Sequence, residues 1–298
     1  MPKDILAAIQ ANMGGFSKGQ RLIARFILDS YDKAAFMTAS RLGKTVNVSE
    51  STVVRFAAEL GYDGYPAMQK ALQEMIRNKL TSIQRIEVSN DRIGNQDILS
   101  MVMQSDIEKI RMTLEETDRA SFTAAVDAIV SARRIYLLGV RSATAIASFL
   151  GFYFNLIFPN VVLMQVTAVS EVFEQMLHIG PEDVMIGISF PRYSRRTVKA
   201  MEFARDRRAT VIAITDSQAS PLAPIADHTL LAKSDMASFV DSLVAPLSLV
   251  NALIVALGRR MDNDLSATFG QLEQIWDEYQ IYAKVEDEAQ EGGSSVKG

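Results

Sequence analysis

Apolar residues recur at intervals of three and four along the first 80 residues, which is the period of a helix with one buried face. This spacing predicts helices over residues 4–12, 18–31, 35–44, 49–60 and 66–80, the last of them opened by Pro66 at a first-turn position. Residues 81–96 are polar and lose the period, which predicts a linker between two domains. Two further helical stretches, 97–116 and 118–131, lead into the second part.

From residue 133 the pattern changes, and short β-rich runs alternate with helical stretches. The runs are RIYLLG, VVLM, DVMIGIS, TVIAIT and HTLLA. Helices are expected between and after them, over 143–156, 170–178, 194–207 and 238–258. Strands separated by helices form right-handed crossovers, so we expect a parallel sheet covered on both faces. A last helix is predicted over 264–284, and the acidic, Gly/Ser-rich end is expected to be disordered.

Composition narrows the class of protein. The chain has 298 residues, of which 48% are hydrophobic and 22% charged, so it is long enough for two globular domains. It has no cysteine, which excludes disulfides and thiolate chemistry and suits a reducing cytoplasm. No apolar run reaches the roughly 18 residues of a membrane span, and no signal peptide is visible. We therefore expect a soluble, cytoplasmic protein without a membrane partner.

The charge is distributed unevenly. Residues 1–80 hold 11 Lys and Arg against 7 Asp and Glu, whereas the whole chain has a net charge of −4. A basic head on an acidic body is typical of a module that binds a polyanion such as nucleic acid. Ordinary local fluctuation remains an alternative for so small a surplus.

Residues 39–58 meet the requirements of a helix-turn-helix unit. Gly43 is the small residue needed where the second helix crosses the first, and Asn47 tolerates the left-handed backbone that the turn requires. Gly61 is expected to end the second helix. The apolar residues that would lock the two helices together are Leu42, Val46, Val48, Val53 and Phe56.

The start of the second helix carries the side chains that would read DNA. Ser49 is a natural N-cap, whereas Glu50, Ser51, Thr52 and Arg55 lie on the outward early turns, the part that enters a major groove. Lys44, at the end of the first helix, is placed to meet a backbone phosphate. A helical hairpin with a solvated polar face is the alternative. The candidate contacts to double-stranded DNA are Lys44, Ser49, Glu50, Ser51, Thr52 and Arg55.

The run VSESTVVRFAAELGYDGYPAMQKAL, residues 48–72, closely resembles the N-terminal domain of the RpiR (MurR/RpiR) family of bacterial transcription regulators. The resemblance implies two domains: an all-α helix-turn-helix domain, then an α/β sugar isomerase (SIS) domain. The latter is expected to hold a five-stranded parallel sheet of order 2-1-3-4-5 flanked by helices. It also implies a regulator of carbohydrate or other catabolic genes that senses a phosphosugar. The expected division is 1–80 for DNA binding, 81–108 for a linker and connecting helix, 109–284 for the effector and 285–298 for the tail.

Two loops that follow predicted strands carry anion-binding chemistry. In an open parallel sheet, ligands bind at the carboxyl ends of the strands, where helix N-termini favour negative charge. The first loop runs from Gly139 to Ser142, and the second from Ser189 to Thr197 offers four hydroxyls and three arginines. Arginines at a helix N-terminus oppose the helix dipole, so an anionic ligand explains them better than solvation does. The candidate effector-binding residues are Gly139, Arg141, Ser142, Ser189, Arg192, Tyr193, Ser194 and Thr197.

These loops resemble the phosphosugar loops of SIS domains, whose second loop reads S-x-S-G-x-T, with two departures. Residues 191–193 are inserted, and Arg195 stands where that loop has glycine. A backbone without that glycine approaches a phosphate less easily, while Arg192 adds a cation. We therefore expect a small anionic effector, with the phosphosugar identity left open.

The competing class is a phosphosugar isomerase, which needs a general base. The candidates are His178, His228, Glu171 and Glu174, but catalysis would leave the first domain without a role. We expect a binding protein without metal or cofactor. We also expect a homo-oligomer, a dimer or tetramer, because a single helix-turn-helix makes too few base contacts. Its seam would lie along 238–258, although a helix buried within one chain shows the same pattern.

Overall fold

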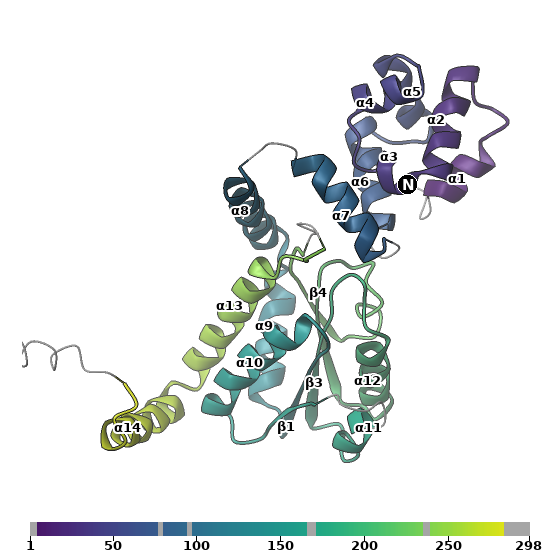
Figure 1. Cartoon of the computed structure of the whole chain (residues 1–298). Coiled ribbons are helices and arrows are strands. Elements are labelled where there is room, and N and C mark those ends of the chain that lie inside the picture. The colour runs from purple at the N-terminus through teal and green to yellow at the C-terminus, as the bar shows by residue number, and fades with distance from the viewer. Residues whose placement is uncertain (1–4, 77–79, 94–96, 166–170, 235–238, 283–298) are drawn as a thin grey trace, which may run out of the picture.

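Six helices build the N-terminal domain in the computed structural model, which describes residues 5–76, 80–93, 97–165, 171–234 and 239–282 (Figure 1). They pack around one core that includes Ile23, Ile27, Leu42 and Phe56, each fully buried. Their bounds are α1 (Ile5–Ala11), α2 (Lys18–Asp29), α3 (Tyr31–Ala34), α4 (Ala39–Thr45), α5 (Glu50–Glu59) and α6 (Tyr65–Ile76).

α4 and α5 form the predicted helix-turn-helix, and its special positions are confirmed. A Cβ on Gly43 would lie only 2.8 Å from the carbonyl oxygen of Val48, so only glycine allows the two helices to cross this closely. Asn47 in the turn has a φ of 56°, and Gly61 after α5 has a φ of 83°. Both φ values lie in the left-handed region, which Asn and Gly tolerate best.

Part of the segment predicted as a linker is helical: α7 (Ser82–Ile93) is a helix of 12 residues that the loss of apolar period did not predict. A local signal for it exists in the sequence. The Thr81 hydroxyl accepts a bond from the backbone N–H of Gln84, and the Gln84 side chain accepts one from the backbone N–H of Thr81. This reciprocal pair is a capping box, and it satisfies two backbone donors at the start of the helix.

The second domain contains one parallel sheet of order β2-β1-β3-β4-β5, as the resemblance implied. Along β1, Ile135 and Leu137 belong to the core on one face of the sheet, and Tyr136 and Leu138 to the core on the other. This alternation follows from the two-residue period of a strand and explains why the strand interiors are mostly apolar on both faces. The strands are β1 (Arg134–Gly139), β2 (Val161–Leu163), β3 (Asp183–Ile188), β4 (Thr210–Thr215) and β5 (His228–Leu231).

Helices cover both faces of the sheet (Figure 1). One face packs against α9 (Arg119–Val130), α10 (Ala143–Ile157) and α13 (Val244–Arg260), and the other against α11 (Glu171–Gln175) and α12 (Arg195–Asp206). α8 (Ile98–Glu116) packs along α13, and α14 (Asp262–Glu278) extends from its end. Within the described ranges, no single helix has the length and hydropathy needed to cross a membrane; α13 and α14 pass only as a pair bent by 103°.

α13 begins at Val244 rather than at residue 238, and its apolar face is mostly an intrachain one. Leu249, Val250 and Leu253 are buried in the core beneath the sheet. The expectation that these residues form a seam between subunits is therefore wrong, because the same side chains already pack against α9 and α10. Val244 remains 39% exposed at the start of the helix.

Candidate functional site

α5 presents a polar, outward face that includes most of the expected DNA contacts. Glu50, Ser51 and Arg55 are exposed on it, and Lys44 is exposed at the end of α4. The Arg55 guanidinium bonds the carbonyl oxygen of Ser51 at 3.3 Å, which aligns it along the helix. Val54 is 42% exposed and shares this face. Sequence reasoning missed Val54, although its spacing from Glu50 and Ser51 on a helix was sufficient to find it.

Ser49 and Thr52 stabilise the start of α5. The Ser49 hydroxyl accepts a bond from the backbone N–H of Thr52, which is the predicted N-cap contact. It also lies 2.9 Å from the Ser51 hydroxyl and 2.8 Å from that of Thr52. Thr52 is half-buried next to Gly19 of α2. Ser51 and Arg55 are therefore better placed than Ser49 or Thr52 to reach a ligand.

A hollow of about 460 Å³ lies where β1 and β3 end. Since these strands are neighbours in the sheet, the two loops that follow them meet. The hollow is lined by five of the expected effector-binding residues: Arg141, Ser142, Ser189, Arg192 and Ser194. The N-termini of α10 and α12 both begin next to these residues. Two helix dipoles and two guanidinium groups make the hollow favourable for an anion.

The second loop is held by its own hydroxyls. The buried Ser189 hydroxyl accepts a bond from the backbone N–H of Ser194 at 3.0 Å. The Ser194 hydroxyl accepts one from the backbone N–H of Thr197 and so caps α12. Each hydroxyl keeps its own hydrogen to donate. Both serines therefore position the loop and still offer a donor.

The other three expected effector-binding residues do not line the hollow. The Tyr193 hydroxyl donates to Asp216 at 2.8 Å, on the far side of the loop. Thr197 is fully buried. Gly139 lies beneath the first loop, where a Cβ would come within 2.3 Å of the Ala143 carbonyl oxygen. Its role is to let α10 begin directly over β1.

Residues outside the two loops complete the hollow, and sequence reasoning missed them. Ser82 and Arg85 come from α7, and Asp241 comes from the segment before α13. The Arg85 guanidinium pairs with the Asp241 carboxylate at 2.7 Å, and that of Arg192 donates to the Ser82 hydroxyl at 3.3 Å. Only the tertiary structure brings these segments together, because residues 85 and 241 are far apart in the chain.

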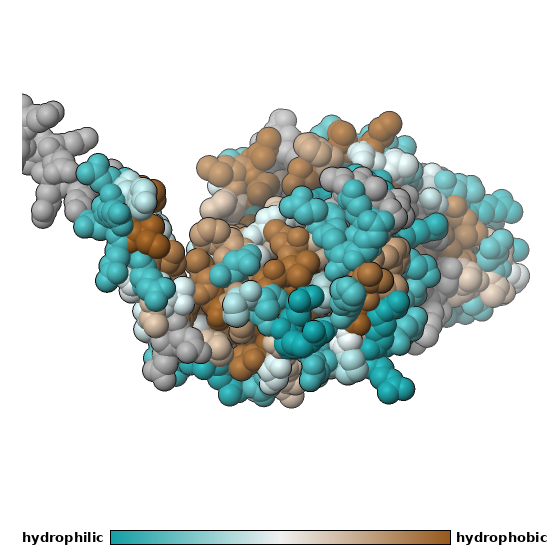
Figure 2. Space-filling model, turned by 90° about the horizontal axis from the view of Figure 1, so that it is seen from below, coloured by the Kyte–Doolittle hydropathy of each residue, from teal (hydrophilic) through white to brown (hydrophobic). Residues whose placement is uncertain are grey.

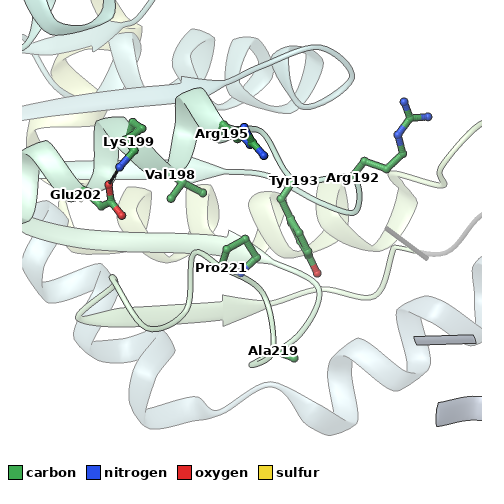
Figure 3. A pocket seen from close by; sticks show the side chains of 8 residues that line it. All are labelled: Arg192, Tyr193, Arg195, Val198, Lys199, Glu202, Ala219 and Pro221. Carbon is green, nitrogen blue, oxygen red and sulfur yellow. Dashed lines mark hydrogen bonds and ion pairs between the residues drawn. The ribbon is translucent and has the colours of Figure 1, made fainter. Parts of the chain in front are cut away.

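A second, shallower groove lies beside the loop, along α12 (Figure 3). In it the Lys199 ammonium is paired with the Glu202 carboxylate at 2.7 Å. Figure 3 shows the Arg192 side chain extending away from the other labelled residues of this groove. Arg195 also lines the groove, but the hollow between the two loops combines Arg141 and Arg192 with two helix N-termini, so the hollow is the better anion site.

The candidate catalytic bases are not in the hollow. None of His178, His228, Glu171 and Glu174 is among the described residues that line it. Among the residues that the structure describes, no group of three or more His, Cys, Asp or Glu could hold a metal ion.

Comparison with known proteins matches one family model to each part of the chain. Residues 3–79 match the helix-turn-helix domain of the rpiR family, and residues 128–256 match the SIS domain. The HTH-type transcriptional regulator HexR of Escherichia coli is 25% identical over 225 residues, which cover 74% of each protein. HexR of Pseudomonas aeruginosa is likewise 25% identical, over 74% of this chain and 76% of that protein.

Two solved structures are similar to this chain. The sugar isomerase domain of an RpiR transcription factor from Sphaerobacter thermophilus is 31% identical, with a TM-score of 0.58 over 60% of this chain and 99% of that one. The Vibrio vulnificus NanR protein, complexed with ManNAc-6P, is 21% identical, with a TM-score of 0.58 over 94% of this chain and 100% of that one. Both domain models and the relatives, which are regulators rather than enzymes, lead to one assignment: this chain belongs to the RpiR family of helix-turn-helix transcription regulators with a SIS domain.

Proposed function

We propose that the chain binds operator DNA through α5 and that a phosphorylated sugar, or a related small anion, binds in the hollow and changes that DNA binding. The observation that carries the proposal is the meeting of Ser142, Ser189 and Arg192 with two helix N-termini at the ends of β1 and β3. The bound sugar phosphate named for the similar Vibrio vulnificus protein supports this ligand class. The regulator would act in the cytoplasm, on carbohydrate or other catabolic genes.

The effector half of the proposal is tested by binding. A thermal-shift screen of phosphorylated sugars and small carboxylates selects a ligand, and calorimetry then compares variants of the full chain. Arg192→Ala should weaken binding by roughly 1.5–3 kcal/mol, because charge-assisted bonds are the strong ones. Ser142→Ala should cost less, and neither should change DNA affinity without ligand. Arg260→Ala is the control, since that arginine pairs with Asp127 at 2.5 Å outside the hollow.

The DNA half is tested by mobility shifts on genomic fragments. Arg55→Ala and Ser51→Ala should each weaken specific binding by about 1–3 kcal/mol if these side chains reach base edges. Val54, the apolar member of the same face, is suited to contact a thymine methyl group. Unchanged shifts in the Arg55 variant would show that α5 is not the reading helix.

The regulator is proposed to work as a homo-oligomer, a dimer or tetramer. α8 has an exposed apolar stripe whose members are spaced by three or four residues, as in helix–helix seams. These are Leu99, Met103, Ile107, Ile110 and Leu114, which are 37–72% exposed. Figure 2 also shows apolar residues gathered on one face of the molecule. Paired subunits would present two α5 helices to paired half-sites.

A further inference from the structure

α7 lies between the two domains and has two faces with different partners (Figure 1). Ser82 and Ser89 lie on one side of the helix and Gln84 lies on the opposite side, whereas Arg85 and Val88, three residues apart, lie between them. Arg85, Val88 and Ser89 are all buried. Because α7 packs against both domains, a displacement of α7 at one domain changes its packing against the other.

One face of α7 forms a wall of the anion hollow. Arg85 is only 4% exposed, and its guanidinium pairs with the Asp241 carboxylate at 2.7 Å. The Ser82 hydroxyl accepts a bond from the Arg192 guanidinium at 3.3 Å. Arg85, Asp241, Arg192 and Ser142 all line the same hollow. The connecting helix thus brings a third arginine to a site whose other two arginines come from the SIS domain.

The opposite face of α7 contacts the DNA-binding domain. The Gln84 side-chain amide donates to the Asp32 carboxylate of α3 at 3.2 Å. A smaller hollow of about 360 Å³ next to this bond is lined by Val88 together with Phe36 and Met37. A shift of α7 would therefore change its packing against the domain that carries α5.

The segment that carries Asp241 is held in place by contacts with α8. The hydroxyl of the next residue, Ser242, donates to the Asp106 carboxylate of α8 at 2.6 Å. Asp106 also pairs at 3.3 Å with the Lys109 ammonium, whose side chain is 5% exposed. These contacts hold the Asp241 segment to α8, so a break between Arg85 and Asp241 would move α7 rather than that segment.

The Asp241 carboxylate repels an anionic ligand in the hollow. It also forms an ion pair with Arg85, the arginine that such a ligand would bind. An anion placed between Ser142 and Arg192 is repelled by Asp241 and attracted by Arg85. We infer that Arg85 of α7 is an effector-binding residue and that the anionic group of the effector replaces Asp241 as its partner, which shifts α7 from the Asp241 segment toward the ligand. This inference rests on the proposed function and adds the route by which the hollow controls the DNA-binding domain.

Calorimetry on the full chain tests it, with inorganic phosphate and ManNAc-6P as probes. Arg85→Gln should weaken binding of the probes roughly ten- to a hundredfold, because a charge-assisted bond is lost. Asp241→Asn should instead tighten it several-fold, because the competing carboxylate is gone while the side chain keeps its size. Arg260→Gln, which also breaks an arginine–aspartate pair, is the matched control and should bind as the parent does.

The opposite effects of Arg85→Gln and Asp241→Asn on probe affinity distinguish a role in ligand binding from a purely structural role. If the Arg85–Asp241 pair only supported the fold, the two variants would change binding in the same direction, and that result would overturn the inference. If Arg192→Ala weakens binding and Arg85→Gln does not, the hollow remains the effector site but α7 takes no part in it. If the parent binds a probe and neither Arg192→Ala nor Arg85→Gln changes that binding, the probe binds outside the hollow and the proposed function fails as well.

Discussion

Replacing Gly43 by alanine tests the crossing of α4 and α5 on which the DNA-binding assignment depends. The added Cβ would lie 2.8 Å from the Val48 carbonyl oxygen, and 3.4 Å from both the Glu50 nitrogen and the Ser49 carbonyl carbon. These neighbours are backbone atoms, and the Val48 N–H is itself bonded to the Gly43 carbonyl oxygen at 2.8 Å. The strain therefore cannot be relieved by rotating a side chain.

The free-energy change follows from two opposing effects. Overpacking costs about 1–3 kcal/mol, whereas alanine in a helix gains about 0.5–1 kcal/mol over glycine. Because the clash is with backbone, the overpacking cost is expected in the upper half of its range, and the net loss is about 1–2 kcal/mol. The shift of α5 should also weaken binding to all DNA sequences.

Hydrogen exchange of the full chain, followed peptide by peptide, measures this loss in the domain concerned. Core peptides containing Phe56 should exchange about 5- to 30-fold faster in Gly43→Ala, and peptides from β1 and β3 should be unchanged. Gly270→Ala is the control, because a Cβ at this position of α14 has nothing within 4 Å. Exchange in Gly43→Ala that is unchanged or slower would refute the close crossing.

Three further predictions concern other parts of the molecule. Lys44→Ala should lower affinity for all DNA sequences alike and reduce the slope of log affinity against log salt by about one, measured by fluorescence anisotropy; a sequence-dependent loss would contradict the phosphate contact. The Tyr65 hydroxyl donates to the Met37 carbonyl oxygen at 2.7 Å, and burial raises the pKa of Tyr65 to about 12. The stability that the neutral Tyr65 side chain contributes is therefore fully present below pH 10 and is lost between pH 10 and 12. Tyr65→Phe should flatten that pH dependence in urea unfolding, and an unchanged profile would refute the assignment. Ile107→Glu should lower the mass found by light scattering, whereas Ile83→Glu, on exposed α7 surface, should not; a monomeric parent would exclude the stripe as a seam.

Local sequence patterns were enough to predict the helices and turns that are stabilised by interactions between residues close together in the chain. The helix period, the N-cap Ser49 and the left-handed positions Asn47 and Gly61 depend on neighbours within four residues, so the helix-turn-helix was readable without a structure. The parallel strands were readable because both faces of the sheet are buried, so most positions of β1, β3 and β4 are apolar. Their order came from the family resemblance, since nothing local in a strand says which strand lies next to it.

The site was only partly readable. Ser142, Ser189 and Arg192 follow strands, so the rule that ligands bind at the strand ends was enough to select them. The same rule selected Tyr193 and Thr197, but the loop turns the first toward Asp216 and buries the second. The direction of a loop side chain depends on partners that are distant in the chain, such as Asp216 for Tyr193, and the local sequence does not indicate these partners.

α7 was missed because its stability comes from both domains. Its sequence is more polar than those of α5 and α6, which favoured a linker, although its apolar residues follow a helical period as clearly as theirs and a capping box starts at Thr81. The faces that bury Arg85 and Val88 exist only once the SIS domain and the DNA-binding domain are folded on either side. Short helices gain most of their stability from such packing rather than from propensity. The sequence by itself therefore determined the two domains, and only the tertiary structure decided that the segment between them is a wall of the hollow proposed to bind the effector.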